Sequence, residues 1–599
     1  MCLEDVILEI EGTPVKCKKD VLISNSDYFK AMLEGNFIEK DQKTISIRDV
    51  DLKAVNIILT LLWDPTIYIE DEDVLMVLHA ACMLQFCEIR NTCLDKLIQI
   101  LSVQNCLKIW IITEQLDIRP FFLKAKRLAL TEFMTIKETD SINDLNLEQL
   151  IRYIGSVHLV TDSELTVFQT LMKWWYDHSK EHTSDDFIKL LSCVNYKKLL
   201  PDLFKEILTY PDIANTEVED ILKCLYNILN NIPNSSCSEK CLAVSSLLSQ
   251  SNDRKIDSVP CFLVLNSSND VPNKKRHVEH NETVVDRYKR KIVYKKFVAD
   301  KSNLHVVYYD RKLGIFRRFV NVLKKLVGFR IIGYKEYIFL FGGEYEIGKG
   351  DWNYSFWAYD SIKEVWRMKS RMPFPRRHFE TCIVGSKVFI SGGVGQFRTI
   401  QSNIFWYDYK TDEWSKQYHF PTTISNRWYK CCNYLDKFLI FSLNEKCAYF
   451  FDENSGWTML PLVIPPLVIP DAINSIFAYK NRLYLKGQQL LEMKAVQGEL
   501  KVISVQSIST LEYDDLEMTI CDNIVYTLYK EHTVNGLCLY SFEKFNLDTD
   551  EMEVIFDRLK EEDTLKAEEE IFDLDQSFNI FSFSHHSLFD ENELVNKNF

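Results

Sequence analysis

The sequence lacks the long apolar run that a transmembrane helix needs and the opening segment that a secreted protein carries. No eighteen consecutive apolar residues occur in its 599 residues, so we expect no contact with a membrane. Glu4 and Asp5 interrupt the start of the chain, which argues against a secretory signal. The seventeen cysteines are dispersed without the spacing of a disulfide framework. We therefore expect reduced thiols and a cytoplasmic location, with the nucleus as the alternative.

The motifs of bond-making chemistry are missing as well. We find no nucleophile elbow, no phosphate-binding loop and no histidine pair with metal-ligand spacing among the twelve histidines. Cys237 and Cys241 form one pair without a second, which is a poor metal signal. The net charge of −15 opposes general nucleic-acid binding, because that binding depends on neutralising phosphates. We expect no enzyme, no catalytic residues, no metal site, no cofactor and no nucleic-acid partner.

What the chain does contain is an internal repeat of about fifty residues. Gly342-Gly343 returns as Gly392-Gly393, and Ser442-Leu443 holds the third position. Each copy then has an aromatic-Asp pair followed by tryptophan: Tyr359-Asp360 with Trp366, Tyr407-Asp408 with Trp414, and Phe451-Asp452 with Trp457. A period near fifty is typical of propeller blades. In such blades the glycines would let neighbouring chains approach closely, and each tryptophan would pack between adjacent blades with one partner for its indole N–H.

These units resemble kelch repeats, in which a double glycine is followed by Tyr-Asp and then Trp. The resemblance implies an all-β six-bladed kelch-type propeller over residues 257–590, followed by a tail at 591–599. The third copy departs from the pattern because it has no glycines. We expect strands at Cys261–Leu265 and Ile571–Phe583 to open and close the ring, and an insertion at about 267–294 to interrupt the first blade.

That insertion begins a strongly basic tract. Between Lys274 and Arg330 we count seventeen Lys or Arg against five Asp or Glu. The tract suits docking of an acidic partner, or a nuclear-import patch. It is equally consistent with a solvated loop and strand edge, where lysines deter pairing with other chains.

Arginines mark a candidate ligand-binding rim. In kelch adaptors an arginine just before the first strand of a blade often faces the ligand, and Arg377 and Arg427 each stand fifteen residues before a glycine position. The resemblance therefore implies a substrate-binding rim made of Arg377, His378, Arg427, Trp428 and Tyr429. The alternative is structural, with each arginine paired to an acidic residue of the adjacent blade.

The first hundred residues have the pattern of a small α+β unit. Alternating apolar residues predict strands at Val6–Ile10, at Val15–Cys17 and around Ile45 and Ile47. Helical periodicity predicts helices at Asp20–Leu33, Leu52–Trp63, Asp73–Leu84 and Ile89–Leu101. The segments Lys18–Leu22, Ser26–Phe29 and Leu78–Gln85 resemble the BTB (POZ) domain, which we assign to residues 1–102.

The BTB resemblance implies two functional elements. Phe37-Ile38-Glu39 matches the apolar-x-acid element of members that bind the ubiquitin-ligase scaffold cullin-3, although a polar loop would fit the same residues. Asp5 and Lys19 match a buried acid and base near the dimer interface, unless Lys19 is exposed to solvent. Only four residues precede Asp5, so we expect a homodimer to be weakened by the missing exchanged segment.

Residues 103–230 continue with helical periodicity. Asn105–Trp110 and Leu171–Trp175 resemble the all-α BACK domain, which in related adaptors sets the distance between scaffold and substrate-binding head. Trp174 and Trp175 are neighbours on one helix, so we expect one to face the core and the other to cover an adjacent helix. A polar linker is predicted at 231–256.

Together these features predict a multidomain adaptor. The BTB end would hold cullin-3, and the propeller would capture a substrate protein, acidic if the basic tract docks it, for ubiquitination by proximity. The alternative is a cytoskeletal, actin-associated or other scaffold protein without a ligase role.

Overall fold

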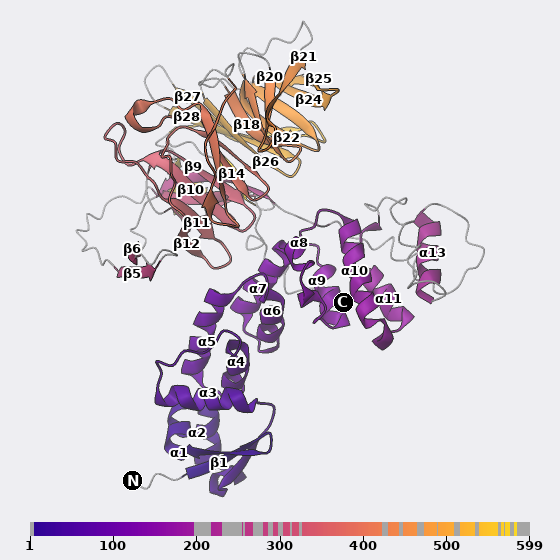
Figure 1. The fold of residues 1–599 in the computed structure, drawn as a ribbon, viewed down its shortest axis with the longest axis vertical. Helices are drawn as coiled ribbons and strands as arrows, with labels where there is room; N and C mark the ends of the chain where they lie inside the picture. Colours follow the sequence, from indigo (N-terminus) through magenta and orange to yellow (C-terminus); the bar gives the residue numbers. More distant parts are fainter. Residues whose placement is uncertain are drawn as a thin grey trace. The chain divides into compact units, whose positions relative to one another are not determined.

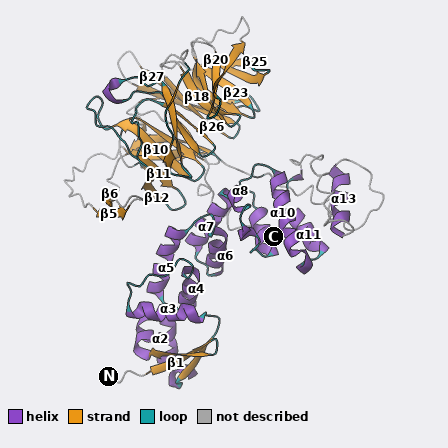
Figure 2. Ribbon diagram, in the orientation of Figure 1, coloured by secondary structure: helices purple, strands orange, loops and turns teal. Residues whose placement is uncertain are grey.

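The structure is a computed structural model of the chain. It describes residues 5–196, 217–229, 254, 258–266, 280–285, 291–296, 304–311, 314–322, 326–421, 429–442, 447–463, 473–487, 489–507, 515–532, 538–560, 565–567, 570–574 and 580–583. These residues form two compact units, one within Met1–Ile256 and one within Asp257–His585. The first unit is mostly helical with one small sheet, and the second is built of strands (Figures 1 and 2).

The first unit begins with a three-stranded sheet of order β2-β1-β3. Strand β1 (Asp5–Ile10) pairs antiparallel with β2 (Thr13–Lys18) and parallel with β3 (Thr44–Ile47). Every second residue of β1, starting at Val6, is buried, because alternate residues of a strand share one face. Helices complete this α+β part: α1 (Lys19–Asn25), α2 (Asp27–Glu34), η1 (Ile38–Asp41), α3 (Leu52–Trp63), α4 (Val74–Met83) and α5 (Cys87–Ile100).

The single helix predicted at Asp20–Leu33 is wrong, because two helices meet there at Ser26. The backbone of Ser26 is extended, with φ −136° and ψ 119°. Its hydroxyl accepts a hydrogen bond from the backbone N–H of Phe29 at 3.0 Å and donates one to the carbonyl of Leu84 at 2.6 Å. This serine therefore caps the second helix where the first ends, a break that apolar periodicity does not reveal.

The rest of the first unit is helical. Its helices are α6 (Cys106–Gln115), α7 (Arg119–Thr131), α8 (Phe133–Ile136), η2 (Asp140–Ile142), α9 (Leu147–Ile154), α10 (Glu164–His178), η3 (Ser179–Glu181), α11 (Ser184–Leu191) and α13 (Glu217–Leu229). Trp174 and Trp175 of α10 are both buried. Trp174 donates its indole N–H to the carbonyl of Leu145 at 3.1 Å, whereas Trp175 packs against Phe187 of α11. The two rings thus serve different neighbours, as expected.

Arg254 is held in this helical region by a buried ion pair. Its guanidinium contacts both carboxylate oxygens of Glu164 at the start of α10, at 2.7 and 3.3 Å. It also donates to the carbonyls of Ile154, Ser156 and Cys193 at 2.9–3.0 Å. All of these are in the first unit, so Arg254 fixes the end of that unit to its helices.

The second unit is the predicted propeller, and its described strands form six blades. Listed from the innermost strand outward, blade 1 is β32 (Ile580–Phe583), β4 (Val259–Asn266), β7 (Leu304–Asp310) and β8 (Ile315–Asn321). Blade 2 is β9 (Val327–Tyr334), β10 (Tyr337–Glu344), β11 (Phe356–Asp360) and β12 (Val365–Met368). Blade 3 is β13 (Glu380–Val384), β14 (Lys387–Ser391), β15 (Asn403–Asp408) and β16 (Glu413–Trp414), with β17 (Tyr418–His419) also on β15.

The other three blades have the same antiparallel order. Blade 4 is β18 (Tyr429–Tyr434), β19 (Lys437–Ser442), β20 (Cys447–Asp452) and β21 (Gly456–Val463). Blade 5 is β22 (Ile473–Tyr479), β23 (Arg482–Gly487), β24 (Gln489–Val496) and β25 (Glu499–Ser507). Blade 6 is β26 (Asp515–Cys521), β27 (Ile524–His532), β28 (Cys538–Asn546) and β29 (Met552–Lys560).

The end of the propeller sequence closes the ring. β32 pairs antiparallel with β4, so the innermost strand of blade 1 comes from the far end of the unit, and the predicted opening strand Cys261–Leu265 is the second strand of its blade. β32 also contacts the inner strands β9 and β26 of both neighbouring blades. Two further strands join this blade, β30 (Leu565–Ala567) and β31 (Glu570–Leu574). The hairpin of β5 (His280–Val285) and β6 (Lys291–Lys296) falls between β4 and β7, where the insertion was predicted.

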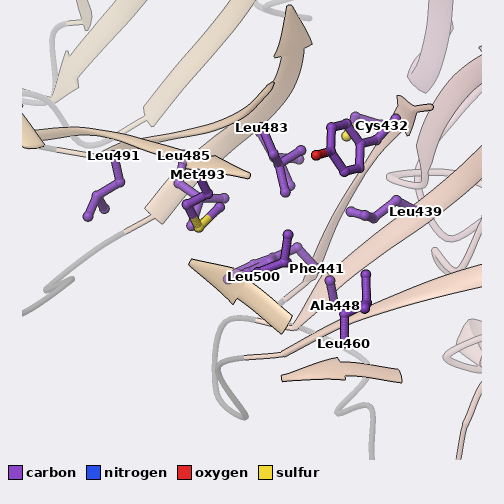
Figure 3. Close-up of a cluster of buried hydrophobic side chains, with 12 residues drawn as sticks. Cys432, Leu439, Phe441, Ala448, Leu460, Leu483, Leu485, Leu491, Met493 and Leu500 are labelled. Atoms are coloured by element: carbon purple, nitrogen blue, oxygen red, sulfur yellow. The ribbon is translucent and has the colours of Figure 1, made fainter. Parts of the chain in front are cut away.

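Blades 4 and 5 are joined more closely than the others. Their outer strands pair in parallel, Leu462 with Leu500 and Val463 with Lys501, so that the two blades form one eight-stranded sheet. Apolar side chains of both blades pack into a shared core, which Figure 3 shows between β19, β20, β23 and β24. This core is built from Cys432, Tyr434, Leu439, Phe441, Ala448, Leu460, Ile476, Leu483, Leu485, Leu491, Met493 and Leu500.

Candidate protein-interaction surfaces

The repeated tryptophans bind each blade to the one before it. The indole N–H of Trp366 donates to the carbonyl of Asn321 at 3.0 Å, and that of Trp414 donates to Ser370 at 3.1 Å. Trp457 makes the same bond to His419 at 2.7 Å. Each acceptor lies at or just after the outer strands of the preceding blade. The predicted packing between blades and the single indole partner are therefore confirmed.

Replacing Trp414 with phenylalanine is expected to lower the free energy of unfolding of the propeller by about 1 kcal/mol. The ring stays in the interface, but the Ser370 carbonyl loses its donor. Thermal unfolding of the full chain measures this change. Trp63→Phe is the matched control, because Trp63 is exposed in the first unit; an equal effect of both variants would contradict the interblade role.

The double glycines allow two close approaches in each blade. A Cβ on Gly393 would lie 2.7 Å from the Cβ of Phe379 and 2.8 Å from the carbonyl of Arg377 in the same blade. A Cβ on Gly392 would lie 1.9 Å from the hydroxyl of Tyr429 in the next blade. Both glycines also have positive φ, which disfavours any residue with a side chain. The sequence prediction of close backbone approach is confirmed.

The aspartate of each aromatic-Asp pair has a local role. The Asp360 carboxylate accepts the backbone N–H groups of Ile362 and Lys363, both at 3.0 Å. The Asp452 carboxylate accepts those of Asn454 and Ser455 at the same distance. Each aspartate thus holds the turn between the third and fourth strands of its blade.

The two ends of the propeller differ in their loops. The first and second strands of a blade are joined by tight turns, such as Lys335-Glu336 between β9 and β10. At the other end, long loops at 345–355, 369–379 and 392–402 connect the strands of blades 2 and 3. Strands alternate in direction, so these three loops lie together. We call this the long-loop end, and it contains the described part of the predicted rim.

Arg377 of the predicted rim is buried and paired within the propeller. Its Nη1 lies 3.5 Å from Oε2 of Glu344, at the end of β10 in the neighbouring blade. The other oxygen of Glu344 accepts the backbone N–H groups of Gly348 and Gly350. This is the interblade ion pair that the sequence also allowed, and a contact between Arg377 and a ligand stays a prediction.

The other rim residues have different surroundings. Tyr429 is buried, and its hydroxyl accepts from Oγ of Ser391 at 3.3 Å. His378 is exposed, and desolvation of its ring together with the charge of Arg377 lowers its pKa. Arg427 and Trp428 lie outside the described residues. The binding role of all five stays a prediction.

Arg376, which sequence reasoning missed, is a buried cation held by neutral groups. Its guanidinium donates to the carbonyls of Gly392 and Asn403 at 2.9 and 3.3 Å and lies 4.5 Å over the ring of Phe405. Burial lowers its pKa to about 10. Among the described residues it has no carboxylate partner, so its positive charge is uncompensated near the long loops.

Ion pairs connect the inner strands of different blades, and we call this set of pairs the charge rung. Arg330 of β9 contacts Glu517 of β26 at 2.9 Å and lies 3.6 Å from Glu380 of β13. Lys430 of β18 contacts Glu380 at 2.9 Å, and that carboxylate raises the pKa of Lys430. The two cations and two carboxylates of this rung neutralise one another. The fifty-residue spacing of Arg330, Glu380 and Lys430 was a sequence signal that could have revealed the rung.

In the first unit, the predicted cullin-binding element lies on the surface. Phe37 and Ile38 are 58% and 81% exposed, and Ile38 begins the short helix η1 that contains Glu39. No described part of the chain covers these two side chains. They form an exposed apolar step that follows α2.

Asp5 and Lys19 contact other residues of the described chain rather than each other. The carboxylate of Asp5 binds Lys16 at 2.7 Å and Lys18 at 2.6 Å, and hydrogen bonds from these lysines lower its pKa. Lys19 Nζ donates to the carbonyl of Lys40 at 3.5 Å. The expected pairing of Asp5 with Lys19 is thus replaced by nearer lysines on β2, and the dimer-interface role of both residues stays a prediction.

The described residues contain no group of three or more His, Cys, Asp or Glu side chains placed to hold a metal ion. Within the same residues, no helix has the length and apolar character needed to cross a membrane. Cysteines of the described chain such as Cys17, Cys93 and Cys521 form no disulfide.

Comparison with known families matches three regions of the chain. Residues 2–101 match the BTB/POZ domain, residues 106–209 match the model described as BTB And C-terminal Kelch, and residues 375–417 match the Kelch motif. The third match begins in the connection between blades 2 and 3 and covers strands β13 to β16 of blade 3, where the glycine and tryptophan pattern is kept.

Similar proteins carry names of the same type. Kelch repeat and BTB domain-containing protein 2 of Homo sapiens is 27% identical over 195 residues, 33% of this chain and 31% of the relative. Kelch-like protein 40b of Danio rerio is 28% identical over 200 residues, 33% of this chain and 32% of the relative. Kelch-like protein 38 of Danio rerio is 30% identical over 170 residues, 28% and 29% of the two chains. The chain thus aligns with about a third of the length of these curated relatives. The three family matches, in this order and on the folds described above, show that the chain carries a BTB part, a BACK part and a kelch part.

Proposed function

We propose that the chain is a substrate adaptor of a cullin-3 ubiquitin ligase. The BTB part binds the cullin, the propeller binds a substrate protein, and the helical region links the two. The chain supplies no bond chemistry, because holding a substrate close to the charged ubiquitin conjugate is sufficient to raise its rate of modification. We propose the cytoplasm as its location.

The observation that carries this proposal is the exposed apolar step at Phe37 and Ile38. Two large apolar side chains at 58% and 81% exposure gain little from folding, since most of their surface stays in water. Buried against a helix of the cullin, the same side chains would form an aromatic anchor. Glu39 beside them would then meet a basic residue at the edge of that contact.

Replacing Phe37 and Ile38 together with alanine is expected to weaken cullin-3 binding at least about tenfold, equivalent to about 1.4 kcal/mol. Co-precipitation of the cullin-3 amino-terminal domain with the full chain measures the loss. Met83→Ala is the matched control, since Met83 is an exposed apolar residue elsewhere in the same part. Unchanged binding of the double variant would remove the mapped contact, and co-sedimentation with actin filaments without any cullin-3 binding would favour the scaffold alternative.

A further inference from the structure

The long-loop end carries exposed apolar side chains between blades 2 and 3. Phe397 is 95% exposed, and Ile347 and Ile400 are also open to solvent. Phe397 and Ile400 belong to the loop 392–402 of blade 3, and Ile347 belongs to the loop 345–355 of blade 2. We call these three residues, together with Arg371 and Arg398, the loop patch.

Contacts between the loops hold the patch together. The side-chain amide of Gln396 donates to the hydroxyl of Tyr354 at 2.6 Å. The guanidinium of Arg371 lies 4.3 Å from the centre of the same tyrosine ring. A Cβ on Gly348, next to Ile347, would lie 2.7 Å from Nη2 of Arg398. The patch is therefore one packed surface formed by two blades and the connection between them.

The backbone holds Phe397 in an unfavourable conformation. Phe397 (φ 55°, ψ 25°) and Arg398 (φ 56°) are consecutive residues in the left-handed region, which is costly for residues with a Cβ. Hydrogen bonds from Gly395 to Thr399 and from Gln401 to Gly393 fix this turn. The Phe397 ring makes no contact that would stabilise the fold in return, because it is almost fully exposed. A strained residue that contributes nothing to the core points to a binding role.

The charges around the ring are predominantly positive. Arg371 and Arg398 are exposed, and neither forms an ion pair with any described residue. The buried Arg376 adds a third cation without a carboxylate. The carboxylate of Glu344, at the end of β10, faces Arg377. On the loops themselves Glu346 pairs with Lys349, so Asp351 is the remaining negative charge. This positive surface belongs to a chain with a net charge of −15.

We propose that the loop patch binds a peptide segment in which a carboxylate stands beside a large apolar side chain. The apolar side chain of the peptide would pack on Phe397 and Ile400. The guanidinium of Arg398 would bind the peptide carboxylate, because this group can donate two parallel hydrogen bonds to a carboxylate. This inference rests on the proposed function, because it names the class of substrate segment that the propeller recognises. It places peptide binding on the exposed loop 392–402 rather than on the buried Arg377.

A displayed library of random twelve-residue peptides, selected on the full chain, tests the proposal. We expect the enriched peptides to share Asp or Glu next to Leu, Ile, Met or Phe. Their dissociation constants should rise at least tenfold for Phe397→Asn and for Arg398→Glu, and should also rise with salt for the wild-type chain. Enrichment of basic sequences, no enrichment, or equal binding by these variants would overturn it.

Two matched controls separate binding from folding. Asparagine tolerates the left-handed region, so Phe397→Asn should leave the melting temperature unchanged or raise it while binding is lost. Met459→Asn and Lys494→Glu make the same kinds of change at other exposed positions and should leave peptide binding unchanged. Cullin-3 binding is measured on the same variants. If the wild-type chain binds cullin-3 but selects no such peptides, this inference alone is overturned. If the wild-type chain selects such peptides but does not bind cullin-3, only the ligase role is overturned.

Discussion

Replacing Arg254 with alanine should destabilise the helical region by about 3–5 kcal/mol, the usual cost of leaving a buried charge without its partner. The carboxylate of Glu164 is 4% exposed, and in the described chain it would keep the hydrogen bond from the backbone N–H of Asn195 at 3.0 Å but lose its cation. The carbonyls of Ile154, Ser156 and Cys193 would lose their donors at the same time. Hydrogen exchange of α9, α10 and α11 in the full chain measures the effect as faster exchange.

The matched control is Arg152→Ala. Arg152 binds Glu114 on the same unit, but the two side chains are partly exposed, and such pairs contribute about 0–1 kcal/mol. Equal exchange in the two variants would contradict the structural role given to Arg254.

The second large effect is expected at Lys486, whose side chain is fully buried between blades 5 and 6. Its Nζ lies 3.0 Å from Oε1 of Glu543 and 2.9 Å from the hydroxyl of Thr527. Lys486→Met would leave the buried Glu543 carboxylate, which also accepts from the hydroxyl of Tyr529, without the charge of the lysine, at a cost of about 3–5 kcal/mol. Burial lowers the pKa of Lys486, so this lysine depends on Glu543 to stay charged.

A double variant, Lys486→Met with Glu543→Leu, should recover much of the loss, because an apolar pair of similar volume often replaces a buried ion pair without net cost. Calorimetric unfolding of the full chain compares both with Lys480→Met, which removes an exposed pair with Asp548. A single Lys486 variant as mild as Lys480→Met would refute the buried-pair account.

The sequence predicted the features that repeat. Trp366, Trp414 and Trp457 each donate a hydrogen bond to the preceding blade. Because this structural role is repeated in successive blades, the tryptophans recur at a regular spacing that can be detected in the sequence. The BTB and BACK resemblances rest on helices whose apolar positions also recur. The six-bladed fold class was therefore accessible before any coordinates.

Structural features that occur only once in the chain could not be predicted from the sequence in this way. Arg254 and Glu164 are ninety residues apart, and no pattern in either segment points to the other. Ser26 looks like any polar residue on a helix until its hydroxyl is seen to cap α2. The rim was predicted at Arg377 from the family pattern, but the neighbouring Glu344 that pairs with it could not be identified without the register of β10.

The exposed Phe397 was also beyond the sequence. A phenylalanine a few residues after a double glycine is equally compatible with a core position, and only the left-handed turn places it in solvent. The same holds for the exposed Phe37, where the family resemblance rather than the pattern of apolar residues suggested a surface role.

The adaptor account is tested most directly by calorimetric titration of the full chain with the cullin-3 amino-terminal domain. The account predicts saturable binding with a dissociation constant of about 1 μM or tighter, equivalent to about −8 kcal/mol. The chain must first show a cooperative unfolding transition by calorimetry. If that folded chain then shows no measurable binding at concentrations about a hundredfold higher, the account is contradicted.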